Sequence, residues 1–319
     1  HGALDVSALE RTLGEILRRH DILRTVYLLE GDRIVPAVRA EASVRLAAAD
    51  LSCLPAGERL AAAERLAETE LLRPFELSAE IPFRPVLARL GTEDHILLLA
   101  IHHIAFDVTS EDVFLREASE IYPAFRTGRA SPLAGVAPRY ADFARAQRAR
   151  AGSEGEEASR AYWRNVLRDP PPALELPANP EPRSARPARI RRGSRDLPEA
   201  LAEAVRGFAS ARGATPFMAA MAALLVLLRR ITDREDLVVG FPVTLRDDLG
   251  SGDAIGLYTN TLLLRADLSG NPEACVLLDR VRDSILEAFE HRDFPFERIV
   301  ADLRVARDPD RTPLFDVLM

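Results

Sequence analysis

The sequence contains no lysine and only two cysteines. All 42 basic residues are arginine, a bias that we attribute to a GC-rich genome rather than to function. Cys53 and Cys275 lie far apart in the chain and fit no metal-ligand spacing. We therefore interpret them as structural thiols of a protein in a reducing compartment.

An excess of positive charge and long hydrophobic runs are missing as well. The formal net charge is −7, so the chain lacks the electrostatic footprint of a nucleic-acid-binding protein. The most apolar stretch, residues 216–228, is shorter than the roughly 20 residues that a membrane-spanning helix needs. The N-terminus does not follow the basic, apolar and small-residue pattern of a signal peptide. We expect a cytoplasmic protein with no nucleic-acid or membrane partner.

The composition supports a large folded protein. With 319 residues, 47% of them hydrophobic, the chain can bury a sizeable core, and its length favours two domains or two lobes. The two halves carry a similar mix of helices and strands without a sequence repeat. We expect an α/β protein (α+β, two-layer) with an N-terminal lobe over 1–168, a proline-rich linker over 169–190 and a C-terminal lobe over 191–319.

Hydrophobic periodicity locates most of the elements. Helices are expected at 6–20, 56–72, 110–125, 198–211, 216–231 and 272–290, and strands at 22–29, 33–38, 83–91, 95–103, 236–243 and 259–268. Helix 216–231 begins with a Thr215 cap and Pro216, and its all-round apolar surface predicts burial. The apolar run at 95–103 predicts a strand buried on both faces. Thr109 and Asp112 have the spacing of a capping box for helix 110–125.

The most informative segment is "HHIAFDV" at residues 102–108, where a predicted strand ends and a helix is about to begin. Catalytic groups collect at such positions because a rigid sheet holds them beside a helix N-terminus. A zinc site needs three or four ligands, whereas adjacent strand residues point to opposite faces. No other histidine forms a third-ligand motif, so we predict no metal.

The opposite orientation of His102 and His103 suggests that they have different tasks. One ring is expected to be buried as support, and the other to face a cavity as a general base, because imidazole titrates near neutral pH. Asp107 can orient that ring or pair with an arginine to hold the turn, and we favour the second. A carboxylate buried beside a sheet needs a charged partner; the candidates are Arg24 and Arg246.

Several segments together resemble the condensation domains of nonribosomal peptide synthetases, within the larger group of HHxxxD acyltransferases that includes chloramphenicol acetyltransferase. They follow one another in the family's order over nearly the whole chain, which makes the set more specific than any one motif. The segments are RHDILRT (19–25), HHIAFDV (102–108), YADFARAQ (140–147), YWRNVL (162–167), LELP (174–177), VVGFPVTLR (238–246), IGLYTNTLLLR (255–265), HRDFPFERIV (291–300) and RDPDRTPLFDVLM (307–319).

The resemblance implies two chloramphenicol-acetyltransferase-like lobes in a V-shaped pseudo-dimer, with an active-site tunnel between them. Donor and acceptor peptidyl or acyl carrier proteins would present thioesters on phosphopantetheine arms, and an amine would attack the donor thioester to form an amide. The domain would need no cofactor of its own, and an adenylation domain would be adjacent. Such domains serve antibiotic biosynthesis and other secondary metabolism, including hybrids with polyketide synthases.

The same resemblance assigns roles to individual residues. His103 would be the catalytic histidine, and His102 and Asp107 would support it, with Arg24 or Arg246 as the counter-ion. Thr109, Val108 and Asn260 would line the tunnel.

Two features depart from the family pattern. Val108 replaces a glycine, and valine strongly disfavours positive φ; either the backbone is ordinary here and the glycine was kept for space, or the turn has shifted. We hypothesise that Val108 narrows the tunnel beside His103. The chain also begins after the family's opening segment and ends before the strands that complete the second lobe, so we expect a fragment of a longer, multimodular protein.

Three functions therefore compete. The first is an amide-forming condensation domain, and the second is an ester-forming variant, which would use the same base. The third is a catalytically impaired docking module that binds a carrier protein or a tailoring enzyme. The histidine pair argues against heterocyclisation relatives, which carry aspartates there.

Overall fold

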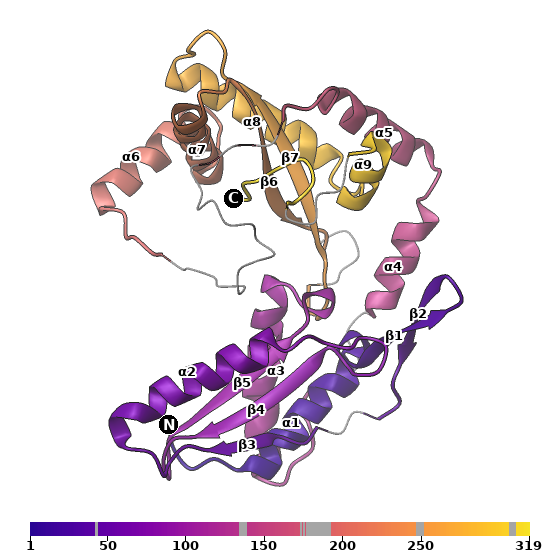
Figure 1. Cartoon of the computed structure of the whole chain (residues 1–319), viewed down its shortest axis with the longest axis vertical. Helices are drawn as coiled ribbons and strands as arrows, with labels where there is room; N and C mark the ends of the chain where they lie inside the picture. Colours follow the sequence, from indigo (N-terminus) through magenta and orange to yellow (C-terminus); the bar gives the residue numbers. More distant parts are fainter. Residues whose placement is uncertain are drawn as a thin grey trace. The chain divides into compact units, whose positions relative to one another are not determined.

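The computed structural model describes residues 1–41, 44–133, 139–172, 174, 176, 193–246, 252–305 and 311–319. The chain divides into two compact units, each described here by itself (Figure 1). The first unit consists of His1–Arg148 together with Arg246–Tyr258, and the second consists of Ala149–Leu245 together with Thr259–Met319. Both units combine helices with a β-sheet.

The first unit is built on a three-stranded sheet in the order β3-β4-β5. Strand β4 pairs antiparallel with β5 and parallel with β3, and a separate hairpin joins β1 to β2. The elements are α1 (Val6–Arg19), η1 (Asp21–Arg24), β1 (Thr25–Glu30), β2 (Arg33–Val38), β3 (Ala47–Asp50), α2 (Ala56–Leu72), β4 (Phe83–Arg89), β5 (His95–Ile101), η2 (His103–Ala105), α3 (Val108–Arg126) and α4 (Tyr140–Ala149).

Helices α1 and α3 pack together over one face of this sheet. The apolar stripe of α1, with Leu13 and Ile16, meets Val113 and Ile121 of α3 and Phe83 of β4 in one buried cluster. Burying each of these side chains contributes about 1.5–3 kcal/mol. Because side chains alternate along a strand, the opposite face of β4 carries residues that pack against α2 instead. The sheet thereby gives the end of β5 a rigid support.

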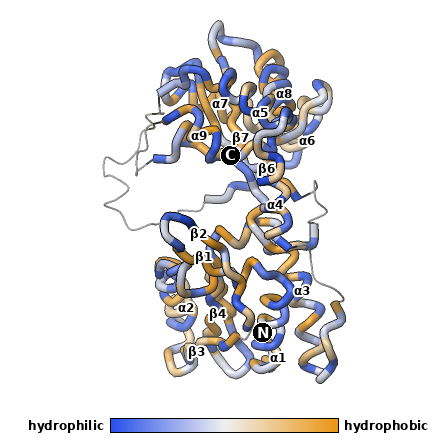
Figure 2. Tube along the Cα trace, turned by 90° about the vertical axis from the view of Figure 1, so that its right-hand side faces the viewer, coloured by the Kyte–Doolittle hydropathy of each residue, from blue (hydrophilic) through white to orange (hydrophobic). Residues whose placement is uncertain are grey.

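The second unit contains a two-stranded antiparallel sheet of β6 and β7. Its core joins buried side chains of both strands to residues from α5, α7 and α8, among them Trp163, Leu225 and Ile285. The elements are α5 (Glu154–Val166), α6 (Glu199–Ser210), α7 (Pro216–Thr232), β6 (Asp236–Thr244), β7 (Thr259–Asp267), α8 (Ala274–Glu290) and α9 (Phe296–Leu303). Strand β7, like β4 in the first unit, runs through strongly hydrophobic sequence (Figure 2).

Most predicted elements are confirmed within one to three residues. Helix α2 occupies the predicted range, and α7 begins with the Thr215 cap and Pro216. Two burial predictions are wrong. The outer face of α7 is exposed, with Leu227 52% exposed, and β5 is only partly buried along most of its length. The physical reason is the same in both cases: in the part of the chain that the structure describes, neither element is covered on every side.

The contact-defined units differ from the predicted lobes at two places. Residues 154–166, which the predicted first lobe included, form helix α5 and lie in the second unit, because Trp163 is part of that unit's core. Residues 246–258, predicted to belong to the second lobe, join the first unit through Arg246. Most of the predicted linker at 169–190 lies outside the described residues.

Three further properties concern the part of the chain that the structure describes. No helix there is long and apolar enough to cross a membrane. No three His, Cys, Asp or Glu side chains gather there as metal ligands. Both cysteines are free thiols, and Cys53 is exposed.

Candidate functional site

The histidine pair begins where strand β5 ends. His102 lies half-buried, and its Nδ1 accepts a hydrogen bond of 3.0 Å from the backbone N–H of Ile104. Its ring also meets the Phe75 ring edge-on at 5.8 Å between centroids. With Nδ1 acting as an acceptor, the ring of His102 is neutral. His102 therefore holds the turn that follows the strand.

His103 is exposed and has a defined tautomer. Its Nδ1 lies 2.6 Å from the carbonyl oxygen of Phe106. A carbonyl oxygen can only accept, so Nδ1 carries the hydrogen, and the lone pair of the neutral ring is on Nε2. Nε2 is thus the atom of this ring that is able to take a proton from a nucleophile.

Asp107 is the N-cap of helix α3. Its Oδ1 accepts from the Ser110 backbone N–H at 2.9 Å and from the Ser110 hydroxyl at 2.7 Å. The Asp107 backbone N–H donates in turn to Ser110 Oγ at 3.4 Å, which completes a capping box. The predicted box of Thr109 with Asp112 is wrong: the helix begins at Val108, and Thr109 is an exposed residue of its first turn. Asp107 caps better because its carboxylate is also charged beside the positive helix N-terminus.

The structure decides which arginine pairs with Asp107. The Nη2 of Arg246 lies 2.6 Å from Asp107 Oδ1, and both side chains are at most 3% exposed. The other carboxylate oxygen accepts from the backbone N–H of Tyr258 at 3.0 Å, whose ring lies 4.5 Å from the Arg246 guanidinium carbon. Four hydrogen bonds satisfy this buried carboxylate, as burial of a charge requires.

Arg24, the other predicted counter-ion, does not contact Asp107. Its guanidinium group pairs with Asp21 and donates to the carbonyl oxygens of Leu17 and Arg39. Those bonds fasten the end of α1 to the β1–β2 hairpin. The prediction that Arg24 is a candidate counter-ion is therefore corrected, because the fold places Arg24 in a local network with acceptors of its own.

Ser110 is a buried site residue that the sequence analysis missed. Its hydroxyl lies 2.9 Å from Arg246 Nη2 and accepts from the backbone N–H of Gly256 at 3.1 Å. A Cβ at Gly256 would lie 2.7 Å from ring atoms of both Tyr140 and Tyr258, so only glycine fits there. The signal available in the sequence was the D-x-x-S spacing from Asp107, an acidic variant of the capping box.

A second buried ionic cluster lies further along α3. Glu117 accepts two bonds from Arg19, at 3.0 and 2.8 Å, and one from His20 Nε2 at 3.0 Å. Burial alone would raise the pKa of Glu117, but the hydrogen bonds from His20 and Arg19 outweigh it and lower that pKa to about 2. His20 Nδ1 accepts from the backbone N–H of Ile255. This cluster, like Asp107, therefore holds the returning segment, the residues 246–258 that rejoin the first unit.

Val108 is the first residue of α3 and is 85% exposed. It is not among the residues with positive φ. Of the two interpretations left open by the missing glycine, the ordinary backbone is the one observed. The consequence is steric: an isopropyl group projects from the helix start immediately after the capping aspartate.

Asn260 belongs to the second unit, where its amide group is fully used. Its Nδ2 donates to the carbonyl oxygens of Arg292 and Phe294, at 2.7 and 2.9 Å, and its Oδ1 accepts from the N–H groups of Thr261 and Phe296. Two donors and two lone pairs exhaust an amide side chain. This amide ties strand β7 to the HRDFPFE segment and has no hydrogen-bonding capacity left for a substrate.

The family model of the condensation domain matches residues 1–319, so this chain belongs to the condensation-domain family, as its motifs predicted. Two of the curated relatives are synthetases from bacteria. Phosphinothricin tripeptide synthetase PhsB of Streptomyces viridochromogenes is 37% identical over 100% of this chain and 27% of its own length. Chondramide synthase cmdD of Chondromyces crocatus is 36% identical over 100% of this chain and 8% of its own length.

The chain thus spans about a quarter or less of the length of these two curated relatives. Among solved structures, the X-domain from teicoplanin biosynthesis is 31% identical with a TM-score of 0.81, over 99% of this chain and 70% of its own. The first condensation domain of the calcium-dependent antibiotic synthetase is 26% identical with a TM-score of 0.76, over 95% of this chain and 70% of its own. The predicted family fold is therefore confirmed.

Proposed function

We propose that this chain forms amide bonds as the condensation domain of a nonribosomal peptide synthetase or of a hybrid with a polyketide synthase. The observation that carries the proposal is the side chain of His103: the residue is exposed, and the bond from Nδ1–H to the Phe106 carbonyl leaves the lone pair of the neutral ring on Nε2. The family and its synthetase relatives supply the reaction class.

In this mechanism the amine of an aminoacyl thioester attacks the carbonyl carbon of the donor thioester. A C–N bond forms, one amine proton passes to or is held by His103 Nε2, and the C–S bond breaks. The released pantetheine sulfur takes up the proton that the amine gave up, and the lengthened chain stays on the acceptor thioester. General-base action contributes roughly 10²–10⁴ in rate, and holding two tethered reactants together can contribute more.

Donor and acceptor carrier proteins are the proposed partners, and their phosphopantetheine arms bring the only prosthetic groups that the reaction uses. An adjacent adenylation domain would load the acceptor. We propose no cofactor, metal, nucleic acid or membrane partner for the chain itself. Val108 and Thr109, which are exposed and follow the His103 turn at the start of α3, stay predicted substrate-lining residues. Asn260 also stays a predicted substrate-lining residue, although its amide cannot form a hydrogen bond with the substrate.

The decisive experiment is a single-turnover assay with both carrier proteins loaded. Replacing His103 with alanine is expected to lower the condensation rate at least about 100-fold while leaving carrier-protein binding unchanged. The matched control is His95→Ala, at the opposite end of strand β5, which should retain the rate. Equal rates for His103→Ala and the unaltered protein would refute the proposed role of His103.

A second candidate function is a docking module that binds a carrier protein or a tailoring enzyme without chemistry. Two observations favour it. Val108 stands where the family motif has glycine, and one solved neighbour is a complex of the X-domain and OxyB from teicoplanin biosynthesis, 30% identical with a TM-score of 0.83. In the same assay this function predicts measurable carrier binding and no product from either the unaltered protein or the variant.

A further inference from the structure

Phe75, in the segment that follows α2, contacts the ring of His102 and belongs to neither of the buried clusters described above for the first unit. It is only half-buried. Its ring lies 5.8 Å from the His102 ring between centroids, with the two planes 86° apart. Aromatic rings favour this perpendicular arrangement, and it fixes their relative orientation. The contact of Phe75 with His102 is therefore specific rather than part of general core packing.

The ring of Phe75 is itself held by Arg84 of strand β4. The guanidinium carbon of Arg84 lies 3.9 Å from the ring centroid, which is a cation–π contact, and the Arg84 side chain is only 10% exposed. The same guanidinium group donates to the carbonyl oxygens of Glu70, Arg73 and Pro74 at the end of α2, at 3.3, 2.6 and 3.4 Å. Arg84 thus fixes both the ring of Phe75 and the chain that leads to it.

The charges around this contact are balanced. Glu80 lies 4.0 Å from Arg84, and Glu70 lies 3.6 Å from Arg73. An uncompensated cation would act on the protonation of His102 through its field, but two arginines beside two carboxylates largely cancel. Arg84 therefore matters to His102 through the position of the Phe75 ring and not through charge.

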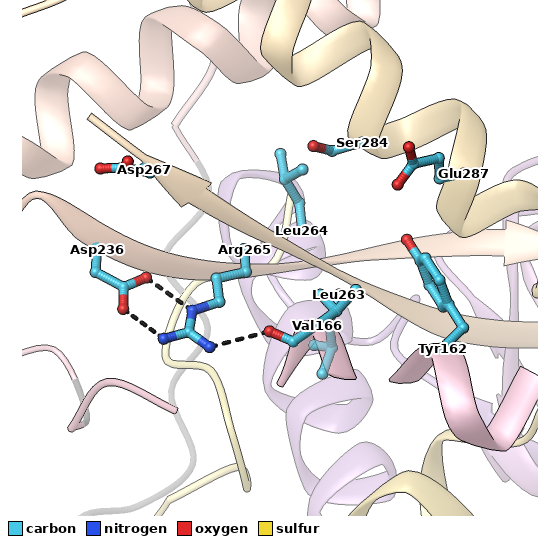
Figure 3. Close-up of a pocket in the computed structure, with 9 residues that line it drawn as sticks. All are labelled: Tyr162, Val166, Asp236, Leu263, Leu264, Arg265, Asp267, Ser284 and Glu287. Atoms are coloured by element: carbon cyan, nitrogen blue, oxygen red, sulfur yellow. Dashed lines mark hydrogen bonds and ion pairs between the residues drawn. The ribbon is translucent and has the colours of Figure 1, made fainter. Parts of the chain in front are cut away.

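Arg265 of the second unit shows what such an arginine does when no aromatic ring is part of its contacts. It donates to three carbonyl oxygens at the end of α5 and pairs with Asp236, beside a cavity of about 470 Å³ (Figure 3). Arg84 and Arg265 both lie on a strand and both fasten the C-terminal end of a helix. In the described part of the chain, only Arg84 of the two also covers an aromatic ring, and that ring contacts His102.

The ring of His102 in turn holds the turn that carries His103. Its Nδ1 accepts from the backbone N–H of Ile104 at 3.0 Å. Rotation of the ring would take Nδ1 away from that N–H and leave the turn without this bond. The ring of His103 is held within the same turn by the Phe106 carbonyl. A loosened turn would therefore disturb the bond that leaves the lone pair on Nε2 of His103.

We infer that Phe75 is a positioning residue for the candidate base. Arg84 holds the Phe75 ring, Phe75 limits rotation of the His102 ring, and His102 orders the turn that carries His103. The effect on rate rests on the proposed function, whereas the order of the turn can be measured without any reaction.

Hydrogen exchange at the Ile104 amide measures that order. Phe75→Leu removes the ring but keeps an apolar side chain, and should speed exchange at Ile104 at least about tenfold by local opening. Phe75→Tyr keeps the ring and should exchange there like the unaltered protein. The matched control is Phe125→Leu at the opposite end of α3. Phe125 is also half-buried and covered by a cation, with Arg11 4.3 Å from its ring centroid, and its replacement should leave Ile104 unaltered.

A pair of arginine variants tests the same role while Phe75 is kept. Arg84→Gln should speed exchange at Ile104 in the same direction by a smaller factor, because the Phe75 ring loses its cover. The control is Arg59→Gln. Arg59 also donates to three carbonyl oxygens, near the start of α2, so its replacement costs similar bonds but should not change exchange at Ile104. If Phe75→Leu does not fold, this pair decides the question.

The single-turnover assay with both carrier proteins loaded tests the effect on rate. Phe75→Leu should lower the rate at least about tenfold with carrier binding unchanged, because misplacing a reacting group by about 1 Å can cost about 100-fold. Phe75→Tyr should restore the rate, and Phe125→Leu should retain it.

Unchanged exchange at Ile104 in Phe75→Leu, equal effects of Phe75→Leu and Phe125→Leu, or failure of the tyrosine variant to restore the rate would each overturn the inference. If the unaltered protein makes no product at all, the proposed function fails. Exchange at Ile104 then still decides whether Phe75 orders the turn.

Discussion

Helix α3 carries two buried carboxylates, Asp107 at its start and Glu117 in its third turn, and each has an arginine partner. Asp107 holds the returning segment through Arg246 and the N–H of Tyr258. Glu117 holds the same segment through His20, which accepts from Ile255. The two carboxylates differ in how close they lie in the chain to the candidate base. Asp107 directly follows Phe106, whose carbonyl holds the His103 ring, whereas Glu117 lies further along α3.

One helix therefore uses a buried carboxylate paired with an arginine for two purposes. At Glu117 the buried ion pairs join α1 to α3 and serve the fold. At Asp107 they join the helix start to a segment distant in sequence and also set the position of the candidate base. Variants of either cluster should therefore destabilise the fold, but the two sets should differ in their effect on the condensation rate.

Replacing Asp107 with alanine should have the largest effect. The change removes the helix cap and leaves the Arg246 charge buried without its partner, which costs about 3–5 kcal/mol. We expect faster amide hydrogen exchange throughout the first turns of α3 and a loss of condensation activity. Unchanged hydrogen exchange in α3, together with full activity, would show that neither the helix start nor the reaction needs the Asp107–Arg246 ion pair.

The Glu117 cluster gives a prediction about pH. The pKa of Glu117 is about 2 in the folded chain against an ordinary value of 4.5. A lowered carboxyl pKa stabilises the fold above pH 4.5, and that contribution is lost as the pH falls toward 2. Glu117→Gln should destabilise the first unit by a few kcal/mol at pH 7.

The same variant should show a flatter stability profile than the unaltered protein between pH 4.5 and 2. Denaturant titrations across that range measure the difference. Its condensation rate, measured under conditions where the variant remains folded, should fall much less than that of a Ser110 variant. If Glu117→Gln lowered the condensation rate as much as replacing Asp107 does, the two clusters would not differ in their role.

Ser110→Ala should cost about 1–2 kcal/mol, because it removes one buried hydroxyl from the Asp107–Arg246 cluster. We also expect a lower rate with unchanged carrier binding, since the helix start that follows His103 loosens. Ser110→Thr keeps the hydroxyl and should restore much of the rate. Equal rates for the alanine and threonine variants would indicate that the hydroxyl has only a packing role.

Val108→Gly should have the smallest effect on stability, within about 1 kcal/mol, because Val108 is exposed and its backbone is ordinary. If Val108 restricts access to His103, the glycine variant condenses faster or accepts bulkier acceptors. Comparing two acceptors of different size measures this. No change in condensation rate or in acceptor preference would mean that Val108 does not restrict access to His103.

Prediction from the sequence succeeded where the signal is local. Apolar spacing located α2 and α7, and the cap at Thr215 is set by residues within one helical turn. It failed at strand β3, an alanine-rich stretch whose parallel pairing with β4 gives no periodic pattern. At α3 it chose the wrong cap, because Asp107 and Thr109 both satisfy a capping rule and only the chain path selects between them.

The family, the order of the elements and the position of His102 and His103 at a strand end were predictable from the residues alone. Each of these depends on residues close together in the chain or on motifs read as a set. The three-dimensional fold was needed to show that Asp107 pairs with Arg246, 139 residues away, rather than with Arg24. It alone showed that the amide of Asn260 is saturated and that Nε2 of His103 carries the lone pair. Such pairings depend on which surfaces meet in three dimensions, because a buried charge takes the partner that the fold brings within bonding distance.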